Sequence, residues 1–296
     1  MNRRSFLSNA VGSTSSLSLF SFAVGFPARA RASTLDDEIA AASSGSSGTV
    51  AVFARRMGHP PEIAFNADER FPTASIIKVV ILVSLFQLAE KRPSVMQDRV
   101  TLKLSDFIGG SEILDAYNPG DSISIDRLAR AMIEQSDNTA SNVLITYLGL
   151  DRIARTIAGA GLTRTQLHRH FLDYTAIMHH SENLSTARDM GTLLYEIERG
   201  AHEAVYTVAS PASCRAMIDI MLHQEDRDKL ARGLPPGVPL ANKTGEIDGV
   251  RNDIGIVDPY GEAPYVIAVL TKDLNDFSLG NSAIRRISKV VHNAFA

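Results

Sequence analysis

The chain has 296 residues, of which 45% are hydrophobic and 21% are charged, a composition that predicts a folded globular protein and excludes a disordered or collagen-like one. Its 30 Lys and Arg against 33 Asp and Glu give a net charge of −3, so we expect no nucleic-acid partner. The single cysteine, Cys214, excludes an intrachain disulfide and a Cys-x-x-Cys redox pair.

The start of the chain has the composition of an export signal. Arg3-Arg4 precedes a pair of apolar residues, a weakly apolar Ser/Gly/Ala stretch follows, and small residues provide cleavage sites after Ala30 and Ala32. This pattern resembles a twin-arginine signal peptide, with a frayed cytoplasmic terminus as the alternative. We therefore predict a signal peptide over residues 1–32 and export of a mature domain, residues 33–296, to the periplasm or the extracellular space.

The mature chain has strand patterns near both ends and helical patterns between them. We expect the two ends to build one antiparallel sheet, into which a helical region of about residues 74–225 is inserted. No run reaches the roughly 18 apolar residues of a membrane-spanning helix, so we expect no membrane anchor in the mature chain. We also expect a monomer. In chain order, the sequence predicts a helix over Leu35–Ala42, strands over Thr49–Arg55 and Ile63–Asn66, helices over Ile76–Glu90, Ile125–Gln135, Thr139–Leu148, Thr186–Arg199 and Ser213–Leu222, strands over Asp253–Val257 and Tyr265–Thr271, and a helix over Ser282–Phe295.

The segment Ser75-Ile76-Ile77-Lys78 opens a predicted helix that is apolar on nearly every face, with Thr73 as its predicted cap. A spacing of three puts the Ser75 hydroxyl and the Lys78 amine on one face of that helix. Burial disfavours the charged form of a lysine, so a neutral Lys78 becomes able to accept the Ser75 proton. The alternative is a capping cluster followed by an ordinary lysine, because Ser-x-x-Lys is common by chance.

Two further segments carry side chains suited to the same chemistry. Ser136-Asp137-Asn138 falls between two predicted helices, where a hydroxyl can relay a proton to a leaving group and an amide can bind a substrate carbonyl. Lys243-Thr244-Gly245 falls ahead of the C-terminal strands, where an edge strand can bind a carboxylate and supply a backbone N–H to an oxyanion. Taken singly, the first is most often a helix cap and the second an ordinary strand end.

The three segments together, in this order, resemble the motif set of class A β-lactamases and penicillin-binding proteins. Ser75 and Ser136 lie 61 residues apart, close to the class A spacing, and the stretches 117–125 and 139–142 also resemble that class. The resemblance covers nearly all of the mature chain. It implies an α/β (α+β) fold, in which terminal helices flank a five-stranded antiparallel sheet around an inserted all-helical region.

Carried over residue by residue, the resemblance implies a nucleophile, a proton relay and a substrate-binding edge. Ser75 is then the acylated nucleophile, Lys78 its proton acceptor, and Ser136 the proton shuttle beside Lys243. Asn138 then binds the substrate amide, and Lys243 and Thr244 bind its carboxylate. Gly245 and Glu246 also belong to this edge, and the backbone N–H of Glu246 forms the oxyanion hole together with that of Ser75.

Arg251 falls where some class A enzymes keep a carboxylate-binding arginine, and a surface strand cation is the alternative.

One loop departs from the class A pattern. Class A enzymes carry Arg-x-Glu-x-x-Leu-Asn between the second and third motifs, where the Glu activates the deacylating water, whereas residues 167–173 have Phe171 in its place. A phenylalanine cannot deprotonate water, so we expect slow deacylation unless Asp173 or Lys78 acts as the base.

The leading hypothesis is an exported β-lactamase-like serine hydrolase that acts on the cyclic amide of a small-molecule β-lactam without a cofactor. The alternatives are a serine amidase, esterase or D,D-peptidase-like enzyme on another substrate, and a slow-turnover penicillin-binding sensor.

Four histidines could suggest a zinc site, but their spacing does not support it and no cysteine lies nearby, so we expect no metal. They are His168, His170, His179 and His180.

Overall fold

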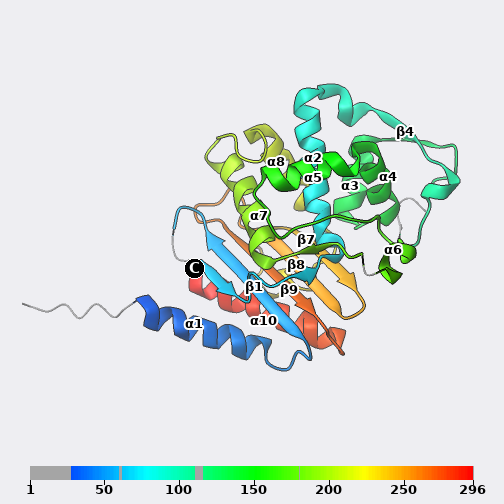
Figure 1. Ribbon diagram of the computed structural model, residues 1–296. Helices are drawn as coiled ribbons and strands as arrows, with labels where there is room; N and C mark the ends of the chain where they lie inside the picture. The colour runs from blue at the N-terminus through cyan, green and yellow to red at the C-terminus, as the bar shows by residue number, and fades with distance from the viewer. Residues whose placement is uncertain (1–27, 60–61, 111–115, 180, 296) are drawn as a thin grey trace, which may run out of the picture.

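A five-stranded antiparallel sheet, in the order β2-β1-β9-β8-β7, forms the centre of the protein (Figure 1). The computed structural model describes residues 28–59, 62–110, 116–179 and 181–295, so most of the predicted signal peptide lies outside the described residues. The two ends of the chain build this one sheet, as the sequence predicts. Its strands are β1 (Thr49–Arg56), β2 (Ile63–Phe65), β7 (Leu240–Ile247), β8 (Val250–Val257) and β9 (Tyr265–Lys272).

The two terminal helices cover one face of the sheet. Helix α1 (Ala28–Ser43) packs beside α10 (Phe277–Phe295), and both lie beneath the sheet in Figure 1. The short helix α9 (Leu230–Gly233) packs on α10 next to them. Their apolar side chains bury the alternate positions of the strands, and the core between them includes Ile39, Val52, Ile267, Val269, Ile284 and Ile287.

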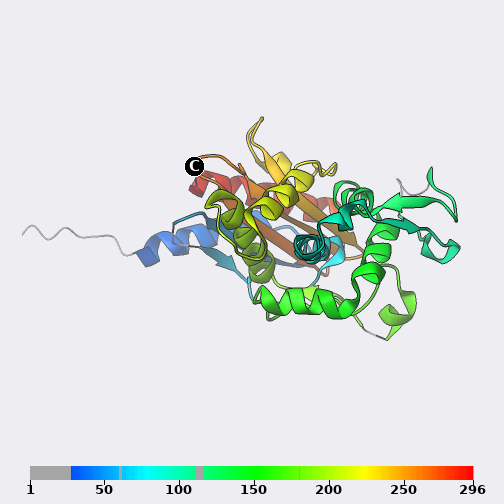
Figure 2. The ribbon, with the colours of Figure 1, turned by 90° about the horizontal axis from the view of Figure 1, so that it is seen from above.

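The other face carries the helical region. Helix α7 (Ala187–His202) lies on β1, β8 and β9, and α2 (Lys78–Lys91) runs away from the sheet, so that the view from above in Figure 2 shows α2 end-on among other helices. The further helices are α3 (Ile125–Glu134), α4 (Asn138–Leu148), α5 (Leu150–Gly159), α6 (Tyr174–Met178) and α8 (Pro211–Met221). Two small sheets pair β3 (Phe71–Pro72) with β6 (Leu184–Ser185) and β4 (Arg99–Thr101) with β5 (Ser122–Ser124).

The start of α2 differs from the sequence prediction. The helix begins at Lys78, after the 3-10 helix η1 (Ala74–Ile77). The prediction that Thr73 caps the helix is wrong, because its hydroxyl donates instead to the Asn183 carbonyl at 3.2 Å. A tertiary partner therefore replaces the local cap, and it connects the start of α2 to a segment more than a hundred residues away.

In the part of the chain that the structure describes, no helix is both long and apolar enough to cross a membrane.

Candidate active site

The three sequence segments meet at the edge of the sheet where β7 lies. Ser75 is in η1, Ser136 is in the connection between α3 and α4, and Lys243 is on β7. The Nζ atoms of Lys78 and Lys243 lie 3.3 Å and 3.0 Å from the same atom, Ser136 Oγ. The fold thus brings together residues that are more than 160 positions apart in the sequence.

Lys78 is fully buried, and oxygen atoms of the second segment hold its side-chain nitrogen. Nζ donates to the Ser136 carbonyl at 2.6 Å and to Asn138 Oδ1 at 2.9 Å. Burial and, next, the positive charge of Lys243 lower the pKa of Lys78 well below that of a free lysine. The amine therefore gives up its proton readily, and the neutral amine is the form that can act as a base.

Lys243 is also fully buried, and its Nζ donates to Ser136 Oγ and to the Thr244 carbonyl, the latter at 2.8 Å. Burial lowers the pKa of Lys243 to about 7, while the carboxylate of Asp253 opposes this shift. Near neutral pH the two lysines therefore do not both carry a full charge. A hydroxyl between such a pair is well placed to pass a proton in either direction.

The backbone around the two serines adopts an uncommon conformation. Ala74, directly before Ser75, has φ of 45°, and Ser136 has φ of 61°, both in the left-handed region that residues with a side chain rarely occupy. Such a conformation persists only where the surroundings hold it in place. Buried Asn252 on β8 supplies one such hold, because its Nδ2 donates to the carbonyls of Pro72 and Thr73 at 3.0 Å and 3.2 Å.

Ser75 itself is half-buried, and its hydroxyl makes no hydrogen bond to any residue that the structure describes. Its backbone lies against β7, because a Cβ added to Gly245 would fall 2.9 Å from Ser75 N. Only a glycine permits this close approach. The start of η1 and strand β7 are thereby in direct backbone contact at Gly245.

Arg251 lies along its own hairpin. Its Nη1 donates to the carbonyls of Ile247 and Val250 at 3.0 Å and 2.7 Å, and its guanidinium stacks on the Phe277 ring, 3.9 Å from the ring centre. The Nε atom is 3.7 Å from a carboxylate oxygen of Glu246. Within the described residues, Arg251 makes no hydrogen bond to Ser75, Lys243 or Thr244, and the predicted site residue that it contacts is Glu246.

A buried lysine behind β7 was not foreseen from the sequence. Lys229 is only 1% exposed, and it forms ion pairs with Glu246, at 2.6 Å, and with Asp226. Burial raises the pKa of Asp226, but the hydrogen bond and charge of Lys229 outweigh it and leave that pKa below its usual value. Lys229 therefore fastens the side chain of Glu246, at the end of β7, to the segment before α9.

Phe171 lies directly against Lys78. The centre of its ring is 4.5 Å from Lys78 Nζ, and the side chain is 9% exposed. Asn142 of α4 fixes the Phe171 backbone by exchanging two hydrogen bonds with it, at 2.8 Å and 3.0 Å. Two residues before Phe171, Arg169 forms an ion pair with Glu182 at 2.6 Å. The loop that departs from the class A pattern is thus held firmly, with an aromatic ring at the lysine.

Asp173 has a structural contact of its own. Its Oδ1 accepts the N–H of Ala176 at 3.0 Å and so caps α6. Among the described residues it makes no hydrogen bond to Ser75, Lys78 or Ser136.

His180 lies outside the described residues, and those that are described contain no group of three His, Cys, Asp or Glu side chains able to hold a metal ion.

The predicted residues therefore divide into two groups. Ser75, Lys78, Ser136, Asn138, Lys243, Thr244 and Gly245 form one connected cluster, whereas the side chains of Glu246, Arg251 and Asp173 make their contacts outside it. The positioning residues Asn142, Asp226, Lys229 and Asn252 were missed, because each is an isolated polar residue that no local pattern marks and that only burial and tertiary contacts reveal.

Comparisons with known proteins identify the family. A model of the Beta-lactamase enzyme family matches residues 34–295. The chain is 29% identical to β-lactamase Toho-2 of Escherichia coli over 80% of its own length and 81% of that protein's. It is also 29% identical to a β-lactamase structure from Sphaerobacter thermophilus, with a TM-score of 0.78 and coverage of 89% and 97% of the two chains. A single-residue mutant of PBP-A, solved as an acyl-enzyme complex with penicillin-G, is similar at a TM-score of 0.79 and 29% identity, over 89% of this chain and 96% of its own. On this evidence the chain belongs to the β-lactamase enzyme family, and its fold is that of the class A members.

Proposed function

We propose that this protein is a serine hydrolase that opens the cyclic amide of β-lactams through an acyl-enzyme at Ser75. The contact of both lysines with Ser136 Oγ is the observation that carries this proposal. The β-lactamase relatives and the penicillin-G acyl-enzyme of the PBP-A mutant support the substrate class. The match of the family model to residues 34–295 supports the same assignment.

The acylation step uses the cluster as follows. Neutral Lys78 accepts the Ser75 proton, Ser75 Oγ bonds to the lactam carbonyl carbon, and the carbon–nitrogen bond of the ring breaks. Ser136 gives its proton to the leaving nitrogen and is reprotonated from the lysines beside it. The N–H groups of Ser75 and Glu246 stabilise the oxyanion, while Lys243 and Thr244 bind the substrate carboxylate and Asn138 its amide.

The hydrolysis of the acyl-enzyme is the slow half of the reaction. A deacylating water needs a base within about 2.6–3.2 Å, directly or through one relay. Phe171 occupies the place beside Lys78 and offers none, and the Asp173 carboxylate is engaged at the start of α6. The protein therefore acylates in a burst and releases product slowly, which also makes it a long-lived binder of penicillins.

We further propose that residues 1–32 are a twin-arginine signal peptide and that residues 33–296 act as one exported, monomeric domain, with the helical region of about residues 74–225 as an insertion in the sheet region. The pair Arg3-Arg4 and the small residues near Ala30 support the export signal. Fractionation of cells that carry Arg3-Arg4→Lys-Lys tests it, since twin-arginine export depends on that pair, and the size of the exported species by gel filtration tests the monomer.

Intact-protein mass spectrometry at successive times after mixing with benzylpenicillin tests the proposed reaction, because it reports acylation and deacylation separately. The expected result is one adduct with the whole mass of the penicillin, located at Ser75, that forms quickly and decays slowly. The Ser75→Ala variant is expected to form no adduct. An adduct at another residue, or one that persists in Ser75→Ala, would contradict the assignment.

A further inference from the structure

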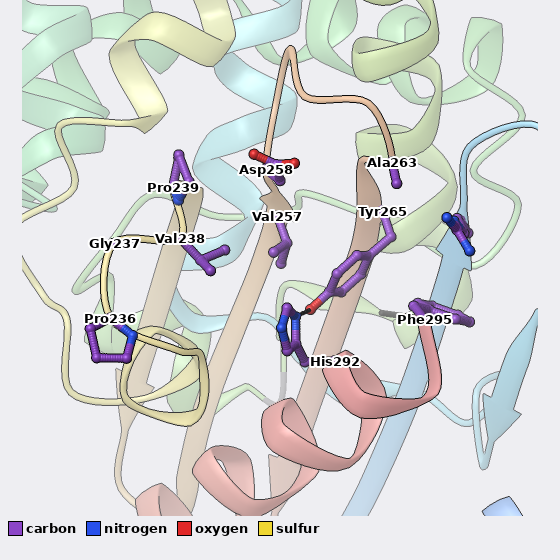
Figure 3. A pocket seen from close by; sticks show the side chains of 11 residues that line it. Pro236, Gly237, Val238, Pro239, Val257, Asp258, Ala263, Tyr265, His292 and Phe295 are labelled. Atoms are coloured by element: carbon purple, nitrogen blue, oxygen red, sulfur yellow. Dashed lines mark hydrogen bonds between the residues drawn. The ribbon is translucent and has the colours of Figure 1, made fainter.

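A second cavity lies on the α10 face of the sheet, away from Ser75. It measures about 490 Å³ and lies between the loop before β7, the adjoining ends of β1, β8 and β9, and the last turn of α10 (Figure 3). Val238, in its wall, is five residues before Lys243, which corresponds to roughly 16 Å along an extended strand. The two sites are thus separated by the sheet and by the first half of β7.

The walls of this cavity are mostly apolar, and one end is polar. Pro236 and Val238 line one side and Phe295 another, while the Tyr265 hydroxyl meets His292 Nδ1 at 3.2 Å between them (Figure 3). The Tyr265 and Phe295 rings pack edge to face, with their centres 5.2 Å apart. When the hydroxyl donates to Nδ1, the other ring nitrogen of His292 carries a hydrogen and is a donor.

Arg56 adds an unpaired cation to the same lining. It pairs with Tyr265 in the β1–β9 register, so the two side chains lie on the same face of the sheet. Its Nε is buried yet has no hydrogen-bond partner, and within the described residues the guanidinium forms no ion pair. A guanidinium without an ion-pair partner favours an anionic ligand that enters the cavity.

Asp258 limits which anion fits. Asp258 also belongs to the lining, and among the described residues it forms no ion pair. This negative charge repels an anionic ligand, and it repels one with two negative charges more strongly than one with a single charge. The volume is in the range of small-molecule sites, which are lined mainly by apolar side chains with a few polar groups that fix orientation.

From these features we infer that this cavity is a second binding site, for a small monocarboxylate with an aromatic or branched apolar body. Arg56 and His292 receive the carboxylate, and Val238, Val257 and Phe295 enclose the apolar part. The site is independent of the reaction at Ser75, because none of its lining residues belongs to the catalytic cluster.

The test measures binding of 3-phenylpropionate by isothermal titration, with the contacts located by NMR shift changes at Val238, Tyr265 and His292. The expected result is saturable binding that weakens by about tenfold in Arg56→Gln, the scale of one lost hydrogen bond to a charge. The matched control is Arg55→Gln, since the neighbouring arginine of β1 stacks on Tyr195 instead and its loss is expected to leave binding unchanged.

Three further arms complete the design. Val238→Phe fills the cavity and is expected to abolish binding, while the neutral amide 3-phenylpropanamide and the dianion 2-phenylsuccinate are each expected to bind about tenfold more weakly. Equal affinity of wild type and Arg56→Gln, equal affinity of acid and amide, or shift changes centred on Ser75 and Lys243 would each overturn the proposal. So would the absence of saturable binding at ligand concentrations up to about 10 mM.

Discussion

The nitrogen of Lys78 faces the ring of Phe171 at 4.5 Å from its centre. An aromatic ring stabilises the charged form of a nearby amine, but it neither accepts a proton nor orients a water. The side chain that lies against the general base therefore favours the charged form of the lysine and adds no base of its own.

Replacement of Phe171 by glutamate is expected to accelerate deacylation by about 100-fold, the lower range of what a positioned general base contributes. The decay of the Ser75 adduct in the mass spectrum measures this rate. Phe171→Leu is the matched control, because it alters the ring without adding a base and is expected to remain slow. Equal decay rates for the glutamate variant and wild type would show that a missing base is not what limits turnover.

The Asp173→Asn variant is expected to deacylate at the wild-type rate. Asparagine caps a helix about as well as aspartate does, so the contact with Ala176 survives while the carboxylate is lost. The same adduct-decay measurement reports the result. Rapid wild-type turnover that disappears in Asp173→Asn would instead identify this carboxylate as a relocated base.

The Lys78→Met variant is expected to fold and to form the Ser75 adduct at least about 100-fold more slowly, because the general base is lost while the buried stem is replaced by an apolar one. Circular dichroism and the rate of adduct formation measure the two effects. Lys289→Met removes an exposed lysine of α10 and serves as the control. An unchanged acylation rate in Lys78→Met would remove this residue from the mechanism.

Acylation by benzylpenicillin is expected to fall as the pH rises through about 7, where Lys243 loses its proton and with it the charge that binds the substrate carboxylate. The sign follows from the direction of titration, since the protonated form that prevails below this pKa is the one that binds an anion. The methyl ester of benzylpenicillin has no carboxylate and should lack this limb of the pH profile. Parallel profiles for acid and ester would argue against the role of Lys243.

Glu198 of α7 is a buried acid whose carboxyl oxygens have no hydrogen-bond partner among the described residues, and burial raises its pKa to about 7. In the folded state this carboxyl keeps its proton between pH 4.5 and 7, whereas in the unfolded chain it ionises, so stability falls as the pH rises through this window. Glu198→Gln is expected to raise the free energy of unfolding by about 2 to 3 kcal/mol at pH 8 and to change it little at pH 4. Urea denaturation at the two pH values measures the difference, and a variant no more stable than wild type at pH 8 would show that the acid is accommodated without cost.

The order and spacing of the motifs around Ser75, Ser136 and Lys243 were sufficient to predict the family, the antiparallel sheet and the residues of the central cluster. These features are readable because strands and helices follow local periodicity, and because each motif lies within a few consecutive residues. The loss of the loop glutamate was visible for the same reason, since Phe171 stands in a recognisable stretch.

Tertiary structure alone decided the contacts between distant segments. Thr73 lost its predicted capping role to Asn183, and Arg251 lies on carbonyls of its own hairpin. Asn252 and Lys229 emerged as supports of the site only through their burial. The depressed pKa values of Lys78 and Lys243 likewise depend on burial and on the distance between two charges. The physical reason is that desolvation and long-range hydrogen bonds are set by what packs around a residue in space, which no run of neighbouring residues encodes.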